Sequence, residues 1–556
     1  MATINPRKWR YTYESQSHIP ILKLFLFSPN FNPIIHCDNL SINLIFEKSV
    51  VELSWNSQNL PNLVKIIVPL PRVLVDLDSP LNFRAHDDHI EVKIPLLLPV
   101  DHPIVSSFIS DLSSGDDFER FDAEDEFLTP LSMDSDFKDL SCKGDVEVCC
   151  RSCGFKLTKH SVRCLVDLPS VNWTDVADNW FGSCCCSFGS ISEKLVNKYV
   201  KLYRCTEGSC LLTSASLILC KDDITGFEAT LAELHIGKCD DIPVDNDSCE
   251  SDHNAGTDVP CSTESSVSHD PSTIQGSMRF QSEEHSVSGA CKVPDELHDH
   301  DQKPSHTSTG VDFAKDEHHC CARDAVKSLP EDQELNGSVD LQEEQKSFLN
   351  CYLGNAFLFG PSGLSKDIGW IDFSCPQCSH ILGAYPCTDG SEPLDGGVRL
   401  LKCYISISTP PDIQDELFRK YTLERMFTCQ LLESAKDELS FRTVVKDLNT
   451  KCSMLNMILV NPNSWCCSGC CSEDSLEKFV KIYLHPVVKV LFSHCSSNNK
   501  SELSANQEWE SKHQANEVFM LKDVIRELME SIDRAKDSFP PSFSSAQGFH
   551  LSSIPR

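Results

Sequence analysis

Two Cys-x-x-Cys pairs, Cys150 with Cys153 and Cys375 with Cys378, are the residues whose type and spacing point most directly to chemistry. Each pair precedes a short apolar run that is typical of a strand. Two thiolates on one tight turn can bind one edge of a tetrahedral Zn²⁺ ion, and a second such turn completes the tetrahedron. The spacing therefore predicts one closed structural zinc site made of these four cysteines, with no open position for catalysis.

Two other arrangements of the metal ligands remain open. The first pair could bind zinc together with Cys185 and Cys210, which would leave the second pair short of ligands. Alternatively, each pair belongs to a separate site with other ligands. The chain has 30 cysteines, and several are adjacent in sequence, so that their side chains cannot all point at one ion. We expect most of them to be small core residues or free thiols.

Three further groups contain residues that can bind metals. The four cysteines between Cys466 and Cys471 resemble a third pair, but they lie among Asn, Ser and Gly with no partner pair nearby. His86 and His89 flank two aspartates, where we expect a solvated turn and not a metal or acid/base site. Residues 316–321 carry acidic, His and Cys side chains within an acidic stretch, where no fixed surroundings would hold ligands in place.

Charge restricts the partners of the chain. Its 556 residues carry a formal net charge of −33, from 82 acidic and 49 basic side chains. Such a charge repels phosphate backbones and anionic lipid, so we expect protein partners, no direct nucleic acid and no membrane. The N-terminal residues lack the apolar core of a signal peptide, and no apolar run is long enough to span a bilayer. We therefore expect reduced thiols and a cytoplasmic or nuclear location.

The chain is expected to have an α+β fold with a β-rich N-terminal module and a composite zinc-knuckle α/β body. Two long acidic inserts, rich in Ser and poor in periodic apolar residues, are predicted to be disordered and to interrupt this body. A shared zinc ion would join the segments on either side of the second insert. The expected boundaries are 1–105 for the module, 106–144 for the first insert, 145–238 for the first knuckle segment, 239–346 for the second insert and 347–556 for the second knuckle segment.

Hydrophobic periodicity predicts the elements that position these residues. Alternating apolar residues predict strands within 40–46, 51–55, 64–68 and 90–94. A helix with both tryptophans on one face is expected over 172–180, followed by the loop of Cys184, Cys185 and Cys186. In the second half we expect a strand at 398–407, helices at 412–434 and 518–532, and a last strand at 549–554.

The order of several motifs resembles that of the HECT-like ubiquitin ligases, a family also described as binding proteins of a ubiquitin-conjugating enzyme (E2). The resemblance implies an E3 ligase that binds an E2 and promotes ubiquitin transfer to protein substrates. It also implies an E2 contact just after the second knuckle, in residues 380–407, and a HECT-like region in residues 518–556. The motifs are Pro69-Leu-Pro71-Arg-Val, the first Cys-x-x-Cys-Gly, Leu168-Pro-Ser-Val-Asn-Trp173, Cys210 before its apolar run, and Cys375-x-x-Cys378 followed by His380, Ile381, Leu382 and Gly383.

The same resemblance implies an alternative function. Members of the family are also similar to inhibitors or escorts of the endonuclease that processes pre-mRNA 3′ ends. In that case a thiol of the loop containing Cys184, Cys185 and Cys186 would reach the zinc of the nuclease. A zinc-stapled scaffold without either activity is the third interpretation.

The chain departs from a complete HECT ligase in one important respect. Its C-terminal region is too short for a bilobed catalytic domain and has no cysteine after Cys495. A thioester nucleophile therefore cannot be placed in this region, and no catalytic residue can be assigned. We expect any ligase activity to come from positioning the E2 thioester by proximity.

Overall fold

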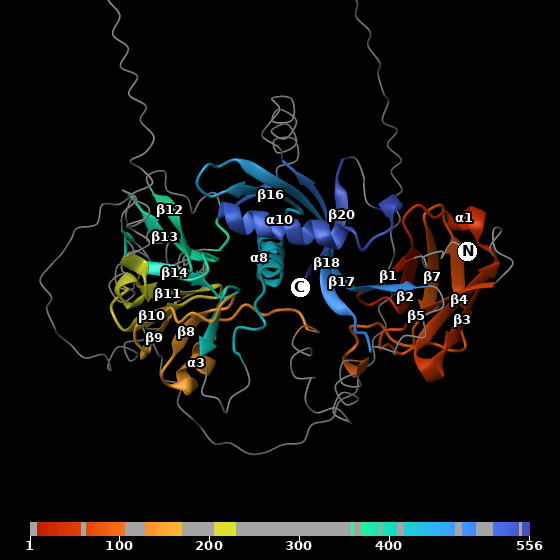
Figure 1. Ribbon diagram of the computed structural model, residues 1–556, viewed down its shortest axis with the longest axis horizontal. Helices are drawn as coiled ribbons and strands as arrows, with labels where there is room; N and C mark the ends of the chain where they lie inside the picture. The colour runs from red at the N-terminus through yellow and green to blue at the C-terminus, as the bar shows by residue number, and fades with distance from the viewer. Residues whose placement is uncertain are drawn as a thin grey trace, which may run out of the picture. The chain divides into compact units, whose positions relative to one another are not determined.

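The computed structural model has a mixed α+β fold whose elements are labelled in Figure 1. Its described residues all belong to one compact unit, formed by Met1–Asp241 and Asp340–Arg556. No helix in this part of the chain is long and apolar enough to cross a membrane. The structure describes residues 8–56, 63–105, 127, 129–168, 205–228, 357–360, 368–388, 392–408, 416–472, 481–495, 515–543 and 548–556. The expected helix at 172–180 and the second predicted insert lie outside the described residues.

The N-terminal module consists of antiparallel strands. The four strands predicted within 40–46, 51–55, 64–68 and 90–94 are confirmed, whereas three further strands, Lys8–Gln16, Ile21–Phe27 and Asn82–Ala85, were not predicted. Leu53 and Trp55 are buried on one face, while the intervening Ser54 is only half-buried. Trp9, Phe31 and Trp55 pack ring against ring at the centre of this core. The strands are β1 (Lys8–Gln16), β2 (Ile21–Phe27), β3 (Asp38–Ile45), β4 (Val50–Asn56), β5 (Leu63–Pro69), β6 (Asn82–Ala85) and β7 (His89–Pro95), with a short helix α1 (Pro33–His36) after β2.

A 20-residue strand, β17 (Ser453–Ser472), connects this module to the C-terminal part of the chain. Its first half pairs with β16 (Arg442–Asp447), and its second half pairs with β1, so that Gln16 lies opposite Ser464. The other edge of β17 pairs with β18 (His485–His494), which pairs in turn with β20 (His550–Pro555). The register shifts around Asn461 to Ser464, where Pro462 is accommodated at an irregularity of the strand. Figure 1 shows β17 beside β18 and β1.

A six-stranded sheet forms the second body. Its order is β12-β13-β14-β11-β10-β9, so that strands from both sides of the second predicted insert lie next to each other. The single strand expected at 398–407 is wrong. The chain instead forms two strands, β14 and β15 (Ile405–Ser408), with a turn at Lys402–Tyr404 between them. The strands of the sheet are β9 (Cys164–Asp167), β10 (Ser209–Leu212), β11 (Ser216–Cys220), β12 (Gly369–Ser374), β13 (Ile381–Cys387) and β14 (Gly397–Leu401).

Gly383 in β13 is required by the close approach of β14. An added Cβ would lie 1.8 Å from the backbone oxygen of Arg399. Arg399 cannot move easily, because its buried guanidinium binds Asp395 at 2.7 and 3.0 Å. We expect Gly383→Ala to lower the free energy of unfolding by about 3 kcal/mol, since overpacking forces the backbone apart. Urea unfolding measures this loss, and Gly369→Ala in the same sheet, where an added Cβ meets only an ordinary contact, should change stability little.

Both predicted C-terminal helices exist, but their beginnings differ from the prediction. Helix α8 (Leu423–Glu438) begins after Thr422, whose side chain accepts a hydrogen bond from the Arg425 N–H at 3.3 Å, and not at residue 412. Helix α10 (Lys522–Lys536) buries Ile525, Leu528 and Ile532 as the periodicity predicted. Val518, also assigned to that helix, lies in β19 (Asn516–Met520), because this segment pairs with β16. The predicted last strand is confirmed as β20.

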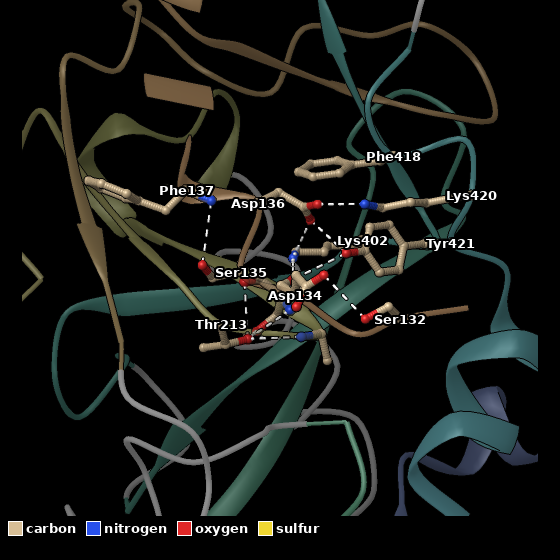
Figure 2. A network of polar contacts seen from close by, with 12 residues as sticks. Ser132, Asp134, Ser135, Asp136, Phe137, Thr213, Lys402, Phe418, Lys420 and Tyr421 are labelled. Carbon is tan, nitrogen blue, oxygen red and sulfur yellow. Dashed lines mark hydrogen bonds and ion pairs between the residues drawn. The ribbon is translucent and has the colours of Figure 1, made fainter. Parts of the chain in front are cut away.

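Part of the first predicted acidic insert, residues 129–144, is folded, which corrects the expectation of disorder there. Leu131 and Leu140 are buried, and the chain forms helix α3 (Phe137–Lys143). The carboxylate of Asp136 accepts hydrogen bonds from Lys402 Nζ at 2.6 Å, Lys420 Nζ at 2.7 Å and the Tyr421 hydroxyl at 2.6 Å (Figure 2). Asp136 is therefore held in place because the second half of the chain supplies the buried Lys402 and the half-buried Lys420 as cationic partners.

Candidate metal centre

The first knuckle is a tight turn at the end of strand β8 (Glu147–Cys150). The Cys150 N–H donates to the carbonyl of Phe155 at 2.8 Å, and the Gly154 N–H donates to the carbonyl of Cys150 at 2.9 Å. Gly154 has a φ of 72°, a left-handed conformation that glycine adopts at little cost. This turn points Cys150 and Cys153 in the same direction, as a pair of metal ligands requires.

The second knuckle repeats this geometry between β12 and β13. The Cys375 N–H donates to the carbonyl of His380 at 2.8 Å, and the Ser379 N–H donates to the carbonyl of Cys375 at 2.9 Å. Ser379 takes the place of the first knuckle's Gly154 and also has a positive φ, 59°. The two turns are therefore built alike, although they are more than 200 residues apart in the sequence.

The pairing of strands brings the two knuckles together. Strand β8 pairs with β15, so that Cys150 lies opposite Ile405. The side chain of Arg151, between the first two cysteines, donates to the backbone carbonyls of Tyr421 at 2.7 Å and Lys402 at 3.2 Å. These contacts fix the first knuckle against the second half of the chain.

The four cysteine sulfurs converge as the spacing predicted. All four Sγ atoms lie within 4.8 Å of one another, with Cys150 to Cys378 at 3.8 Å and Cys153 to Cys375 at 3.6 Å. A tetrahedron with Zn–S bonds of about 2.3 Å has sulfur-to-sulfur edges of roughly 3.8 Å. The donor set and its spacing therefore fit a Zn²⁺ ion bound by four thiolates.

Electrostatics also favour a cation at this position. Burial raises the pKa of Cys150 to about 12, whereas a hydrogen bond from the His380 backbone N–H, together with bonds from neighbouring thiols, lowers the pKa of the exposed Cys378 to about 7. A divalent cation would supply the positive charge that allows all four thiols, including the buried Cys150, to lose their protons and bind as thiolates. The cluster can hold zinc as a structural ion, and all four coordination positions are used.

The chain matches one protein-family model over most of its length. The family is described as HECT-like ubiquitin-conjugating enzyme (E2)-binding, and the match covers residues 98–270 and 314–551. The chain belongs to this family. No curated protein and no solved structure matches the chain. The matched residues include both knuckles and helices α8 and α10, whereas residues 1–97 lie outside the match.

The segment predicted to contact the E2 is mostly internal in this HECT-like E2-binding protein. Ile381, Leu382 and Gly383 lie in β13 and are buried. His380 is half-buried, and its ring packs edge-on against Tyr404 at 5.2 Å. The exposed residues next to them are those of the second knuckle turn, 376–379. The E2 contact at 380–407 stays a prediction, and its exposed residues in the described part of the chain are Thr388, Glu392 and Leu394.

The alternative ligands do not join the four-cysteine group. Cys210 is 1 % exposed within β10 and is not a member of the group. Cys185 lies outside the described residues, as do Cys184 and Cys186 of the predicted nuclease-binding loop. The cluster at 316–321 also lies outside them. Among the residues that the structure describes, the four knuckle cysteines are the one group of three or more His, Cys, Asp or Glu residues placed to hold a metal ion.

The third cysteine cluster lies in strand β17, where neighbouring side chains alternate between two faces. Cys467 and Cys471 lie opposite Tyr13 and Trp9 of β1 and pack against the N-terminal core. Burial raises the pKa of Cys467 to about 12. These two thiols are therefore explained by packing against the N-terminal core.

The turn at His86 and His89 differs from the solvated turn that was expected. His89 is 2 % exposed and shares a hydrogen bond with the carboxylate of Asp88 at 2.7 Å. Its ring stacks on that of His86, with centroids 4.4 Å apart. The packing of the β6–β7 hairpin explains these residues.

Proposed function

We propose that this protein is an E3 ubiquitin ligase that binds an E2 and promotes transfer of ubiquitin to protein substrates. The observation that carries the proposal is the family match across both knuckles and the C-terminal helices. A rigid domain that holds an E2 next to a substrate raises the rate of transfer by proximity alone.

The buried thiols among the described residues are unsuited to act as the nucleophile of a ligase, whereas Cys142, Cys164, Cys452 and Cys470 are exposed. A thioester step needs an accessible thiol with a lowered pKa. Burial instead raises the pKa values of Cys205, Cys210, Cys403 and Cys466. The pKa of Cys378 is lowered, but this thiol belongs to the four-cysteine cluster and would be occupied by zinc. In the proposed mechanism the E2 thioester is the reactive group, and the protein positions it.

The exposed second knuckle turn is the surface through which we propose that the E2 binds. Pro376, Gln377 and Ser379 are exposed, and the turn leads directly into His380. Two backbone hydrogen bonds and the four-cysteine cluster hold the turn in one conformation. A turn that is already ordered loses little conformational entropy when it binds a partner.

We expect Gln377→Arg to weaken E2 binding by about tenfold or more, because a large charged side chain would enter the centre of the contact. Ser152 occupies the same position in the first knuckle and is also exposed, so Ser152→Arg is the matched control. It adds the same charge at the same distance in sequence from a metal ligand. Pull-down with a panel of E2 enzymes, followed by single-turnover discharge of E2-bound ubiquitin, measures both steps.

Three results would contradict this proposal. Equal E2 binding by the two Arg variants would remove the second knuckle turn as the contact. No accelerated discharge with any E2 of a broad panel would remove the ligase activity. A reducible ubiquitin adduct on the protein that one Cys→Ala change abolishes would show that it has a nucleophile of its own.

A further inference from the structure

A cleft with a volume of about 810 Å³ lies on the C-terminal part of the fold, away from the four-cysteine cluster. Its walls come from the ends of α8, α10 and β20 and from the strands β17 and β18. This volume lies within the range of about 300–1,000 Å³ that is typical of ligand pockets. No residue of the knuckles lines it.

The cleft has the opposite charge to the rest of the chain. Among the described residues that line it, Arg425, Lys481, Arg534 and Arg556 are basic, and Glu424 is the one acidic residue. Glu424 accepts a hydrogen bond from Ser531 at 2.6 Å. The whole chain carries a net charge of −33, so a local excess of cations at one cavity creates a site that attracts anions. We call this cavity the basic cleft.

The cations of the basic cleft differ in mobility. Arg425 is 2 % exposed, and its guanidinium donates to the backbone carbonyls of Thr129 at 2.6 Å and Lys420 at 3.0 Å. Arg556 is held by the carbonyl of Pro462 at 3.1 Å. Lys481 and Arg534 are exposed. The cleft therefore combines two cations whose guanidinium groups are held by backbone carbonyls with two that are exposed to solvent.

Apolar side chains lie beside these cations. Phe127, Phe539, Pro486 and Val487 also line the basic cleft, and Phe127 lies under the guanidinium of Arg425 at 5.1 Å. The carboxylates of an acidic peptide could pair with the cations, and the backbone between them could pack against these apolar side chains. An extended polyanion such as a nucleic acid would have to leave the cleft and cross the acidic remainder of the chain.

We propose that the basic cleft binds an acidic peptide segment of a partner protein. This binding goes beyond the ligase activity proposed above and does not depend on the E2 contact. Carboxylates of the segment would pair with Lys481 and Arg534, because a ligand in the cleft can reach these two exposed side chains. The fixed guanidinium of Arg425, whose Nε donates to the backbone oxygen of Arg556 at 3.3 Å, would add long-range attraction.

The full-length protein tests this proposal by fluorescence anisotropy. The probe is a fluorescein-labelled decapeptide of alternating Asp and Ser, and its Asn-for-Asp counterpart is the uncharged control. We expect saturable binding of the Asp peptide that weakens as salt is added. The double variant Lys481→Gln, Arg534→Gln should bind about tenfold more weakly. The double variant Lys65→Gln, Arg526→Gln removes the same charge from exposed positions that do not line the cleft, and should bind like the unmodified protein.

Several results would overturn the proposal. The proposal is wrong if the Asp peptide does not bind, or if the Asn peptide binds as tightly as the Asp peptide. It is also wrong if both double variants weaken binding of the Asp peptide to the same extent. Tighter binding of a single-stranded oligonucleotide than of the peptide would assign the cleft to nucleic acid. The sequence before Phe127 reads Asp122-Ala-Glu-Asp-Glu126. If peptide binding appeared only after these four acidic residues were changed to their amides, the chain itself would be the occupant and not a partner.

Discussion

Replacing Cys375 with Ser should remove the bound zinc and unfold the body that contains the six-stranded sheet. The four-cysteine cluster joins strands on both sides of a long insert, so a lost ligand affects both halves of this body. Structural zinc contributes apparent binding free energies of about 10–16 kcal/mol. A whole domain is stable by only about 5–15 kcal/mol. We therefore expect a variant with little cooperative unfolding, as measured by circular dichroism during heating and by zinc content per chain.

Two control variants make this result specific. Cys452 is exposed and lies outside the cluster, so Cys452→Ser should keep one zinc ion per chain and the normal unfolding temperature. Cys210→Ser tests the other ligand set that the sequence allowed. If the Cys210 variant lost its zinc while the Cys375 variant kept one ion and folded normally, the shared four-cysteine site would be wrong.

Asp136→Asn is the second change for which we expect a large effect. The ammonium group of Lys402 is fully buried and binds this carboxylate at 2.6 Å. Removing one partner leaves the other charge buried without compensation, which costs about 3–5 kcal/mol. Urea unfolding should show this loss. Asp134→Asn is the matched control, because Asp134 is exposed and contributes its backbone carbonyl to the network, which the substitution keeps.

The loss at Asp136 should also depend on pH in a defined direction. Burial alone favours the neutral acid, but the charge of Lys402 and the hydrogen bonds from Lys402, Lys420 and Tyr421 outweigh it, so the pKa of Asp136 is lowered. A group whose pKa is lower in the folded state contributes its full stability above its unfolded pKa, about 3.9. That contribution is lost as the pH falls through the folded pKa. The Asn variant should lack this part of the acid dependence, and equal acid profiles of the two proteins would contradict it.

The sequence allowed good predictions where local chemistry decides the outcome. Coordination geometry favoured Cys150, Cys153, Cys375 and Cys378 over the other ligand sets, because two similar turns with four thiolates satisfy one tetrahedral ion. The alternating strands of the N-terminal module follow in the same way from burial of one face. Neither prediction needed knowledge of distant contacts.

The predictions that failed depend on contacts between distant residues. The strand expected at 398–407 breaks because Lys402 turns inward to Asp136, which is 266 residues away in the sequence. The same ion pair orders residues that looked like part of an acidic insert. Val518 lies in a strand because β16 offers it a partner, although its spacing fits the helix that follows. Burial of the residues 381–383 likewise follows from pairing between β13 and its neighbours, which periodicity cannot reveal.

The long strand β17 means that the protein cannot be shortened to the start of the family match without exposing an edge of this strand. The match begins at residue 98, yet nine residues of β17 have their backbone partners in β1, near the start of the chain. A fragment that began at residue 98 would carry a bare β-edge with Trp465, Cys467 and Cys471 no longer covered by the N-terminal core. Such an edge invites self-association between copies of the fragment. Recombinant work on the matched portion of this family member therefore requires the preceding residues as well.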